Sequence, residues 1–272
     1  MCRGNAVVVA FFVALCLVLD APAHAQEKMS AEELAKISAN PIANLITAQF
    51  QNNTNFKYGP LEGTQNVFNI EPVIPISLSR DWNLITRTIL PIITQPGFTA
   101  GQSSTTGLGD LQFNAFISPN AATALTWGVG PIVQAPTNSN DRLGNDRWGL
   151  GPTAIVVHLD KDSPWVYGAL ANNVWSVGGG SDAKYNNFTL QPFLHYNLSD
   201  GWYVNSTPII TANWEASGSQ RWTVPLGGGG GKVFRIGKLP VNVQLGAYWN
   251  VIAPDNGPAW QLRLQVQLMF PE

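Results

Sequence analysis

The chain has 272 residues, 12% of them charged, and its 15 Lys and Arg against 17 Asp and Glu give a formal net charge of −2 at pH 7. That charged fraction is about half the ~25% usual for soluble domains, and without runs of like charge nothing points to nucleic acid as a partner. The two cysteines are Cys2 and Cys16, so the chain beyond them cannot form a disulfide, a thiolate metal site or a thiol nucleophile.

The N-terminus has the pattern of a secretory signal peptide. Arg3 supplies the positive charge, residues 6–19 are apolar, and Ala23-His24-Ala25 is a small-x-small cleavage site. The apolar stretch is shorter than the ~20 residues that a membrane-spanning helix needs. We therefore predict that residues 1–25 are a signal peptide that is removed before Gln26.

One helix is predicted next, at residues 30–39 ("SAEELAKISA"). Ser30 and Glu33 have the spacing of a capping box, and Pro41 ends the helical pattern. We assign residues 26–41 to an N-terminal periplasmic segment that contains this helix. Residues 42–272 form one β-rich domain with a different pattern.

Beyond residue 42, apolar and polar residues alternate with a period of two, which is the period of a β-strand. In the last run Trp260, Leu262 and Leu264 share one face, and Arg263 and Gln265 lie on the other. We expect twelve such strands, at roughly 44–57, 65–79, 82–95, 107–118, 122–136, 146–159, 164–177, 185–198, 201–214, 220–235, 239–252 and 259–270.

The connections between these runs alternate in length. Tight turns at 79–81, 118–122, 160–163, 199–201 and 237–238 alternate with longer polar loops at 57–64, 95–107, 136–146, 178–185, 215–220 and 253–258. Short periplasmic turns and long exterior loops are typical of outer-membrane barrels. An even number of strands then places both ends of the chain on the short-turn side.

Tryptophan placement favours the same architecture over a soluble β-protein. Of the ten Trp, only Trp127 lies away from a turn or loop, whereas core tryptophans would favour strand middles. Rings at both membrane interfaces form the aromatic girdles of a membrane barrel. The predicted fold is all-β: a single antiparallel transmembrane β-barrel of about 12 strands with a short N-terminal periplasmic helix, in the outer membrane of a Gram-negative bacterium.

Seven prolines fall inside the proposed strands, where each removes one ladder hydrogen bond. They are Pro72, Pro91, Pro131, Pro152, Pro192, Pro208 and Pro225. Two explanations remain open: a ring of bulges or kinks that shapes the barrel, or strands that are shorter than proposed.

The motifs "RDWNLITRTILPII", "GLGDLQFNAFISP", "RWGLGPTAIV" and "GGKVFRIGKLPVNVQLGAYWNV" are similar to those of a bacterial outer-membrane β-barrel "transporter" family. The resemblance covers residues 40–271 and is to the phenol-degradation meta-pathway (MetA-type) outer-membrane proteins. It implies a barrel with a role in solute passage, and it supplies no agreed substrate. Phe270 looks like the C-terminal recognition signal of the barrel assembly machinery, which we expect as a partner alongside outer-membrane lipids.

Alternation predicts which polar side chains line the pore. Glu71 and Arg87, on adjacent strands, are expected to pair across the wall, either as a structural salt bridge or as a selectivity element. Amide groups suit neutral or weakly charged solutes better than strong ion selection. The expected pore-lining residues are Glu71, Arg87, Asp110, Gln112, Asn114, Gln134, Gln191, His195, Asn205, Asn242, Gln244, Tyr248, Arg263, Gln265 and Gln267.

These features favour a channel for passive diffusion of small neutral or weakly polar solutes, with aromatic solutes suggested by the family resemblance. We expect no enzyme activity, no cofactor and no metal site. His158 and His195 lie near tight turns, and no G-x-S-x-G is present. The alternatives are an outer-membrane lipid hydrolase and an occluded structural or lipid-binding barrel.

Overall fold

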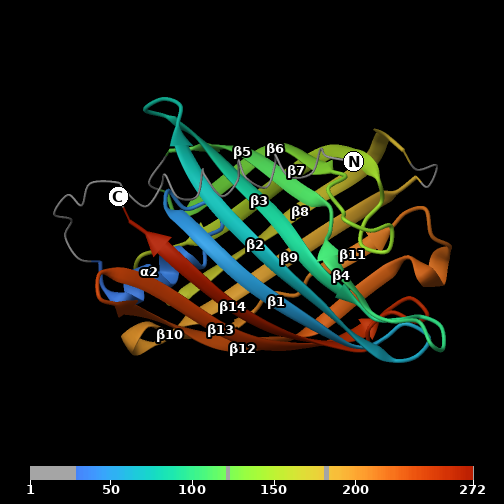
Figure 1. Ribbon diagram of the computed structural model, residues 1–272. Helices are drawn as coiled ribbons and strands as arrows, with labels where there is room; N and C mark the ends of the chain where they lie inside the picture. The colour runs from blue at the N-terminus through green and yellow to red at the C-terminus, as the bar shows by residue number, and fades with distance from the viewer. Residues whose placement is uncertain (1–28, 121–122, 181–183, 272) are drawn as a thin grey trace.

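The strands form a sheet that closes into a barrel in the computed structural model (Figure 1). The structure describes residues 29–120, 123–180 and 184–271. The predicted signal peptide, residues 1–25, lies outside the described residues. The elements are α2 (Ala31–Ser38), β1 (Ile46–Tyr58), β2 (Gly63–Ser77), β3 (Trp82–Gln95), β4 (Thr105–Leu108), β5 (Leu111–Pro119), β6 (Leu125–Ala135), β7 (Arg147–Leu159), β8 (Trp165–Gly179), β9 (Asn186–Asn197), η2 (Ser199–Gly201), β10 (Trp202–Ser206), β11 (Ile210–Asn213), η3 (Gly218–Gln220), β12 (Trp222–Ile236), β13 (Leu239–Ile252) and β14 (Trp260–Phe270).

These fourteen segments make a closed antiparallel barrel of twelve strands. β4 and β5 are two halves of one barrel strand, and β10 and β11 are two halves of another. The predicted continuous runs 107–118 and 201–214 are therefore each interrupted, at residues 109–110 and 207–209. The number of strands and the fold class are as predicted.

The first and last strands pair with each other and complete the ring. Gln49 lies opposite Gln267, and Gln51 lies opposite Gln265, in an antiparallel register that runs from Ile46 to Phe56. Outside, Phe56 stacks on Trp260 with ring centroids 4.0 Å apart. The closure leaves no open sheet edge between these strands, which is the condition for a sheet to cross a bilayer.

The two faces of the wall differ as the alternation requires. The outer face exposes large apolar side chains such as Phe113, Ile117, Leu150, Leu245 and Trp249. The inner face buries polar ones, and the same strand β5 that exposes Phe113 turns Asn114 inward. An apolar exterior around a polar interior is the arrangement of a membrane barrel.

The strand prolines coincide with interruptions in the ladder. Pro72 pairs with β1 but not with β3. Pro131 and Pro152 pair with each other, but Pro131 is unpaired toward β5 and Pro152 is unpaired toward β8. A proline has no N–H to donate, so pairing on one side is what it permits. Pro208 lies in the break between β10 and β11. Among the seven, a register shift occurs at Pro225.

The two remaining prolines lie beside the two strand breaks. Pro91 is paired with β2, but the strand on its other side is broken at residues 109–110. Pro192 is paired with β8, and its other neighbour is broken at residues 207–209. A strand is interrupted at Pro208 and the register shifts at Pro225, so each of the two proposed explanations fits one position.

Helix α2 forms with the predicted capping box, in which Ser30 Oγ accepts from the Glu33 amide and the Glu33 carboxylate accepts from the Ser30 amide. The helix lies at the short-turn end of the barrel (Figure 1), where its Leu34 and Ala35 pack against Tyr203, Val233 and Met269. In the described part of the chain, helices long and apolar enough to span a membrane are not found.

The chain after the helix enters the barrel and meets an apolar inner wall. Ala39 and Ile42 pack in one buried cluster with inward side chains of five strands. Those side chains are Ile85, Phe116, Ile155, Val157, Val166, Leu170 and Phe193. An apolar core therefore occupies the short-turn end of the lumen.

Candidate functional site

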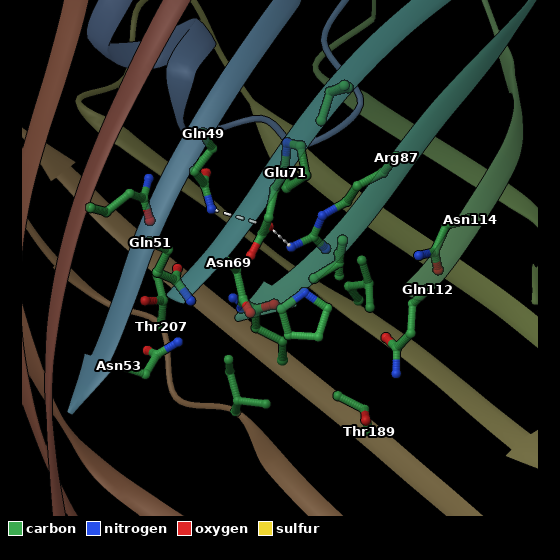
Figure 2. Close-up of a pocket in the computed structure, with 18 of the residues that line it drawn as sticks. Gln49, Gln51, Asn53, Asn69, Glu71, Arg87, Gln112, Asn114, Thr189 and Thr207 are labelled. Atoms are coloured by element: carbon green, nitrogen blue, oxygen red, sulfur yellow. Dashed lines mark hydrogen bonds and ion pairs between the residues drawn. The ribbon is translucent and has the colours of Figure 1, made fainter. Parts of the chain in front are cut away.

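A cavity of about 530 Å³ lies inside the barrel, within the ~300–1,000 Å³ range of small-molecule sites. Side chains from β1, β2, β3 and β5 reach into it (Figure 2). Its boundary at the short-turn end is made by residues of the N-terminal segment, including Ile37, Pro41 and Leu45. The end of α2 and the segment that follows it thus bound the lumen at this end.

Most of the predicted pore-lining residues surround this cavity. Those that line it are Glu71, Arg87, Asp110, Gln112, Asn114, Gln134, Gln191, His195, Gln244, Arg263, Gln265 and Gln267. Asn205, Asn242 and Tyr248 are buried but do not line it. Asn242 instead bonds Tyr203 and Gln267, and Tyr248 lies under Arg263. The part that these residues play in solute passage stays a prediction.

The predicted pair of Glu71 and Arg87 is confirmed. Arg87 Nη2 donates to Glu71 Oε2 at 2.6 Å, between adjacent strands β3 and β2. Gln49 Nε2 on β1 donates to the same oxygen at 3.2 Å (Figure 2). The carboxylate is thus held by donors from both neighbouring strands.

At the long-loop end, the loop between β6 and β7 folds into the lumen. Asp110, at the break between β4 and β5, accepts from the backbone N–H of Asn145 at 2.9 Å and of Asn138 at 3.4 Å. Gln134 donates to the same carboxylate. These bonds bring Leu143 to the cavity wall, where it is 5% exposed.

A second anchor holds this loop from outside the cavity. Arg142 donates to the carbonyl of Pro96 at 2.6 Å and to Thr105 Oγ1 at 2.6 Å, which ties the loop to its neighbour. Tyr185, whose pKa burial raises to about 12, donates its hydroxyl to the carbonyl of Arg147, the residue at which β7 begins. Arg142 thus anchors the loop to the segment around Pro96 and Thr105, while Leu143, Gly144 and Asn145 of the same loop line the cavity.

The largest fully buried side chain is Arg263 on β14. Its Nε donates to Asn53 Oδ1, its Nη1 to the Thr207 carbonyl at 2.8 Å, and its Nη2 to Gln261. Its guanidinium lies 4.7 Å from the ring centre of Tyr248. Because its donors reach β1, the break between β10 and β11, and β14 itself, Arg263 holds the inner wall together at this break.

Several lining residues were not among the predicted ones. Gln49, Gln51, Asn53 and Asn69 line the cavity, and the alternation of β1 and β2 already turned them inward. Thr207 and Ile209 line it because the strand breaks there, and the loop residues Leu143, Gly144 and Asn145 line it because the loop folds inward. No periodicity marks these last two groups.

The two histidines of the described chain have separate surroundings. His195 is buried and lies near Tyr203, with ring centroids 5.4 Å apart, and His158 stacks on Tyr167. Within residues 29–120, 123–180 and 184–271, neither histidine is hydrogen-bonded to a serine or carboxylate, and no cluster of metal-binding side chains occurs. The expected lack of enzyme activity stays a prediction.

No protein-family profile and no curated protein matches the chain. Among solved structures, it is similar to the COG4313 outer membrane channel from Pseudomonas putida F1, with a TM-score of 0.60, 19% identity and 83% and 94% of the two chains covered. A Pseudomonas aeruginosa FadL homologue (8% identity; 83% and 89% covered) and the Salmonella typhi outer membrane phospholipase (11%; 90% and 99%) match at TM-scores of 0.39, too low to carry an argument. The chain thus has the fold of an outer-membrane channel, and the narrower family resemblance is not confirmed.

Proposed function

We propose that the chain is an outer-membrane channel for passive diffusion of small neutral or weakly polar solutes, aromatic ones included. The observation that carries the proposal is the polar cavity inside a closed barrel whose outer face is apolar. The COG4313 channel supports it by its fold alone.

The cavity lining favours uncharged solutes. Amide side chains from β1, β2, β5, β9 and β14 dominate its polar part, and Glu71 and Arg87 offset each other's charge. Asp110 and Arg263, which also line the cavity, carry opposite charges and are bonded to the protein. Apolar side chains such as Val73, Leu170 and Phe193 supply the rest of the wall. A wall of amides and apolar groups can hydrogen-bond a neutral solute without selecting strongly for ions.

The proposed setting is the outer membrane of a Gram-negative bacterium, with α2 on the periplasmic side. Lipid would cover the apolar outer face, and the barrel assembly machinery would insert the chain. The segment from α2 to Leu45 closes the periplasmic end, so passage requires this segment to move. We expect this movement to be thermal, because diffusion needs no energy coupling.

A liposome-swelling assay tests the proposal. Liposomes that contain the folded mature protein are placed in iso-osmotic arabinose, which is neutral, or in glutamate, which is charged. We expect faster swelling in arabinose than in glutamate and none with protein-free liposomes. Swelling no faster than that of protein-free liposomes, with a folded barrel, would exclude passage.

A second function is favoured by one observation, the apolar core that fills the short-turn end. If the N-terminal segment never leaves, the barrel is occluded and binds a solute or lipid without passing it. In that case the folded protein would bind solute in its cavity while the liposomes fail to swell.

A further inference from the structure

We propose that Arg87, with its charge offset by Glu71, is the solute-contacting donor of the cavity, and that the pair selects uncharged solutes carrying an oxygen acceptor over anions. This inference rests on the proposed function and names the solute class of the same cavity. It rests on the different exposure of the two partners and on the unused hydrogen-bonding groups beside them.

The carboxylate of Glu71 is committed to the protein. Its side chain is 3% exposed, and its Oε2 accepts from both Arg87 and Gln49. Because this side chain is 3% exposed, a solute has little access to the carboxylate. The role of Glu71 is therefore to supply a fixed negative charge next to Arg87.

The guanidinium of Arg87 has capacity left. It carries five N–H groups, and in the described chain the one bond formed is from Nη2 to Glu71. Its side chain is 17% exposed and lines the cavity, so the exposed part faces the lumen. Donors that face a cavity without protein acceptors are available to an oxygen atom of a solute.

Asn114 adds a second unused polar group at the same level. It lies directly opposite Arg87 in the β3–β5 ladder, is 2% exposed and lines the cavity. Its Oδ1 has no hydrogen-bond partner in the described chain, although buried polar atoms are rarely left unpaired. Figure 2 shows Arg87 and Asn114 reaching into the cavity from adjacent strands. The Arg87 N–H groups and the Asn114 amide are thus unused polar groups at one level of the cavity wall.

The facing wall fits an apolar body. β9 is the eighth barrel strand and β2 the second, so β9 lies across the lumen from Glu71 in the ring of twelve. From β9, Phe193 and Gln191 line the cavity, and Leu170 joins them from the adjacent β8. A compact molecule with an apolar body and a carbonyl or hydroxyl group would contact both walls.

Charge decides between a neutral solute and an anion of the same shape. A carboxylate on the solute would be attracted by Arg87 and repelled by Glu71, whose carboxylate lies 2.6 Å from the Arg87 guanidinium, so the repulsion offsets much of the attraction. Desolvating the anion then opposes binding. A carboxamide presents the same carbonyl oxygen without that cost, and its N–H₂ can donate to Asn114.

Benzamide and benzoate are matched probes because they share a ring and differ in charge. Their binding to the folded mature protein in micelles is measured by ligand-observed NMR, with protein-free micelles subtracted. We expect benzamide to bind more tightly to the unmodified protein. Glu71→Gln should strengthen benzoate binding on the order of tenfold by removing the repulsion, and leave benzamide within about twofold.

Two further variants complete the test. Glu62→Gln is the matched control, because Glu62 pairs with Lys57 at 3.9 Å in an exposed loop pair, and it should change neither affinity. Asn114→Ala lies outside the ion pair and should weaken benzamide about threefold to tenfold, which keeps a test available if Glu71→Gln does not fold.

The inference is overturned if Glu71→Gln folds and its affinities for benzamide and benzoate keep the ratio found in the unmodified protein. If that variant does not fold, an unchanged benzamide affinity in Asn114→Ala overturns it. Binding as expected in a protein that shows no liposome swelling would remove the channel function and leave the site intact. Swelling without cavity binding of benzamide would retain the channel and refute this site.

Discussion

The guanidinium of Arg263 donates to the backbone carbonyl of Thr207 at 2.8 Å, from β14 to the break between β10 and β11. The same nitrogen reaches Thr207 Oγ1 at 3.1 Å, and the Thr207 hydroxyl lies 2.9 Å from that of Tyr248. Pro208, which follows, cannot donate to a ladder. The buried arginine therefore supplies the hydrogen bonds that the interrupted strand has lost.

Arg263→Gln should destabilise the barrel by about 2–3 kcal/mol, because Thr207 and Asn53 lose a charged donor and stay buried. Arg263→Lys keeps the charge but loses the planar fork, so it should not restore stability. Lys57→Gln, in the exposed loop pair, is the control and should have no effect. Urea unfolding in lipid vesicles measures all three, and an unchanged midpoint for Arg263→Gln would contradict the structural role.

Leu34→Ala should loosen the N-terminal segment from the barrel. Leu34 is 0% exposed and packs against Tyr203, Val233 and Met269, and truncation of such a leucine costs about 2–5 kcal/mol. We expect faster tryptic cleavage at Lys36. Leu61→Ala, in an exposed loop, is the same substitution without packing and should leave the cleavage rate unchanged. Equal rates for the two variants would mean that α2 is not held by this contact.

Asp110→Asn should release the loop between β6 and β7 from the lumen. The amide that replaces the carboxylate keeps one acceptor where two backbone N–H groups and Gln134 now donate. A cysteine at position 143 should then react with a polar maleimide about tenfold faster, the change expected for a loss of ~1.4 kcal/mol. Asp141→Asn, on the same loop, is the control. Unchanged labelling would show that Asp110 does not hold the loop.

Gly231→Ala should destabilise the barrel by about 1–3 kcal/mol, the range for an overpacked interior. A Cβ at Gly231 would collide with the Tyr203 hydroxyl and the Val243 carbonyl, whereas at Gly178 it would meet nothing within 4 Å. Gly178→Ala is therefore the matched control. Thermal unfolding followed by circular dichroism compares the two, and equal midpoints would refute the close contact.

The strand number, the closure of β1 with β14 and the pair of Glu71 with Arg87 were predictable from the sequence. The pleat turns alternate residues to opposite faces, so the strands and their inward side chains come from local pattern, and an open sheet edge is too costly in a bilayer for the first and last strands to stay unpaired. The same reasoning placed Gln112, Asn114 and Gln265 at the cavity.

The strand breaks and the inward fold of the loop between β6 and β7 were not predictable in the same way. The turn at Thr207 depends on Arg263 and Tyr248, which lie on strands far along the chain. The inward position of Leu143 depends on Asp110 in another strand. Contacts between distant segments leave no period in the sequence. Pro208 lies in one break, but it did not say whether the strand would bend or end there, and residues 109–110 contain no proline.

Single-channel conductance in a planar bilayer tests the central claim most directly. The folded mature protein is compared with a variant lacking residues 26–41, and folding of each is checked by circular dichroism. We expect discrete steps from both, more frequent or larger in the shortened variant because the segment that closes the periplasmic end is gone. Folded barrels that conduct in neither form would contradict solute passage through this lumen.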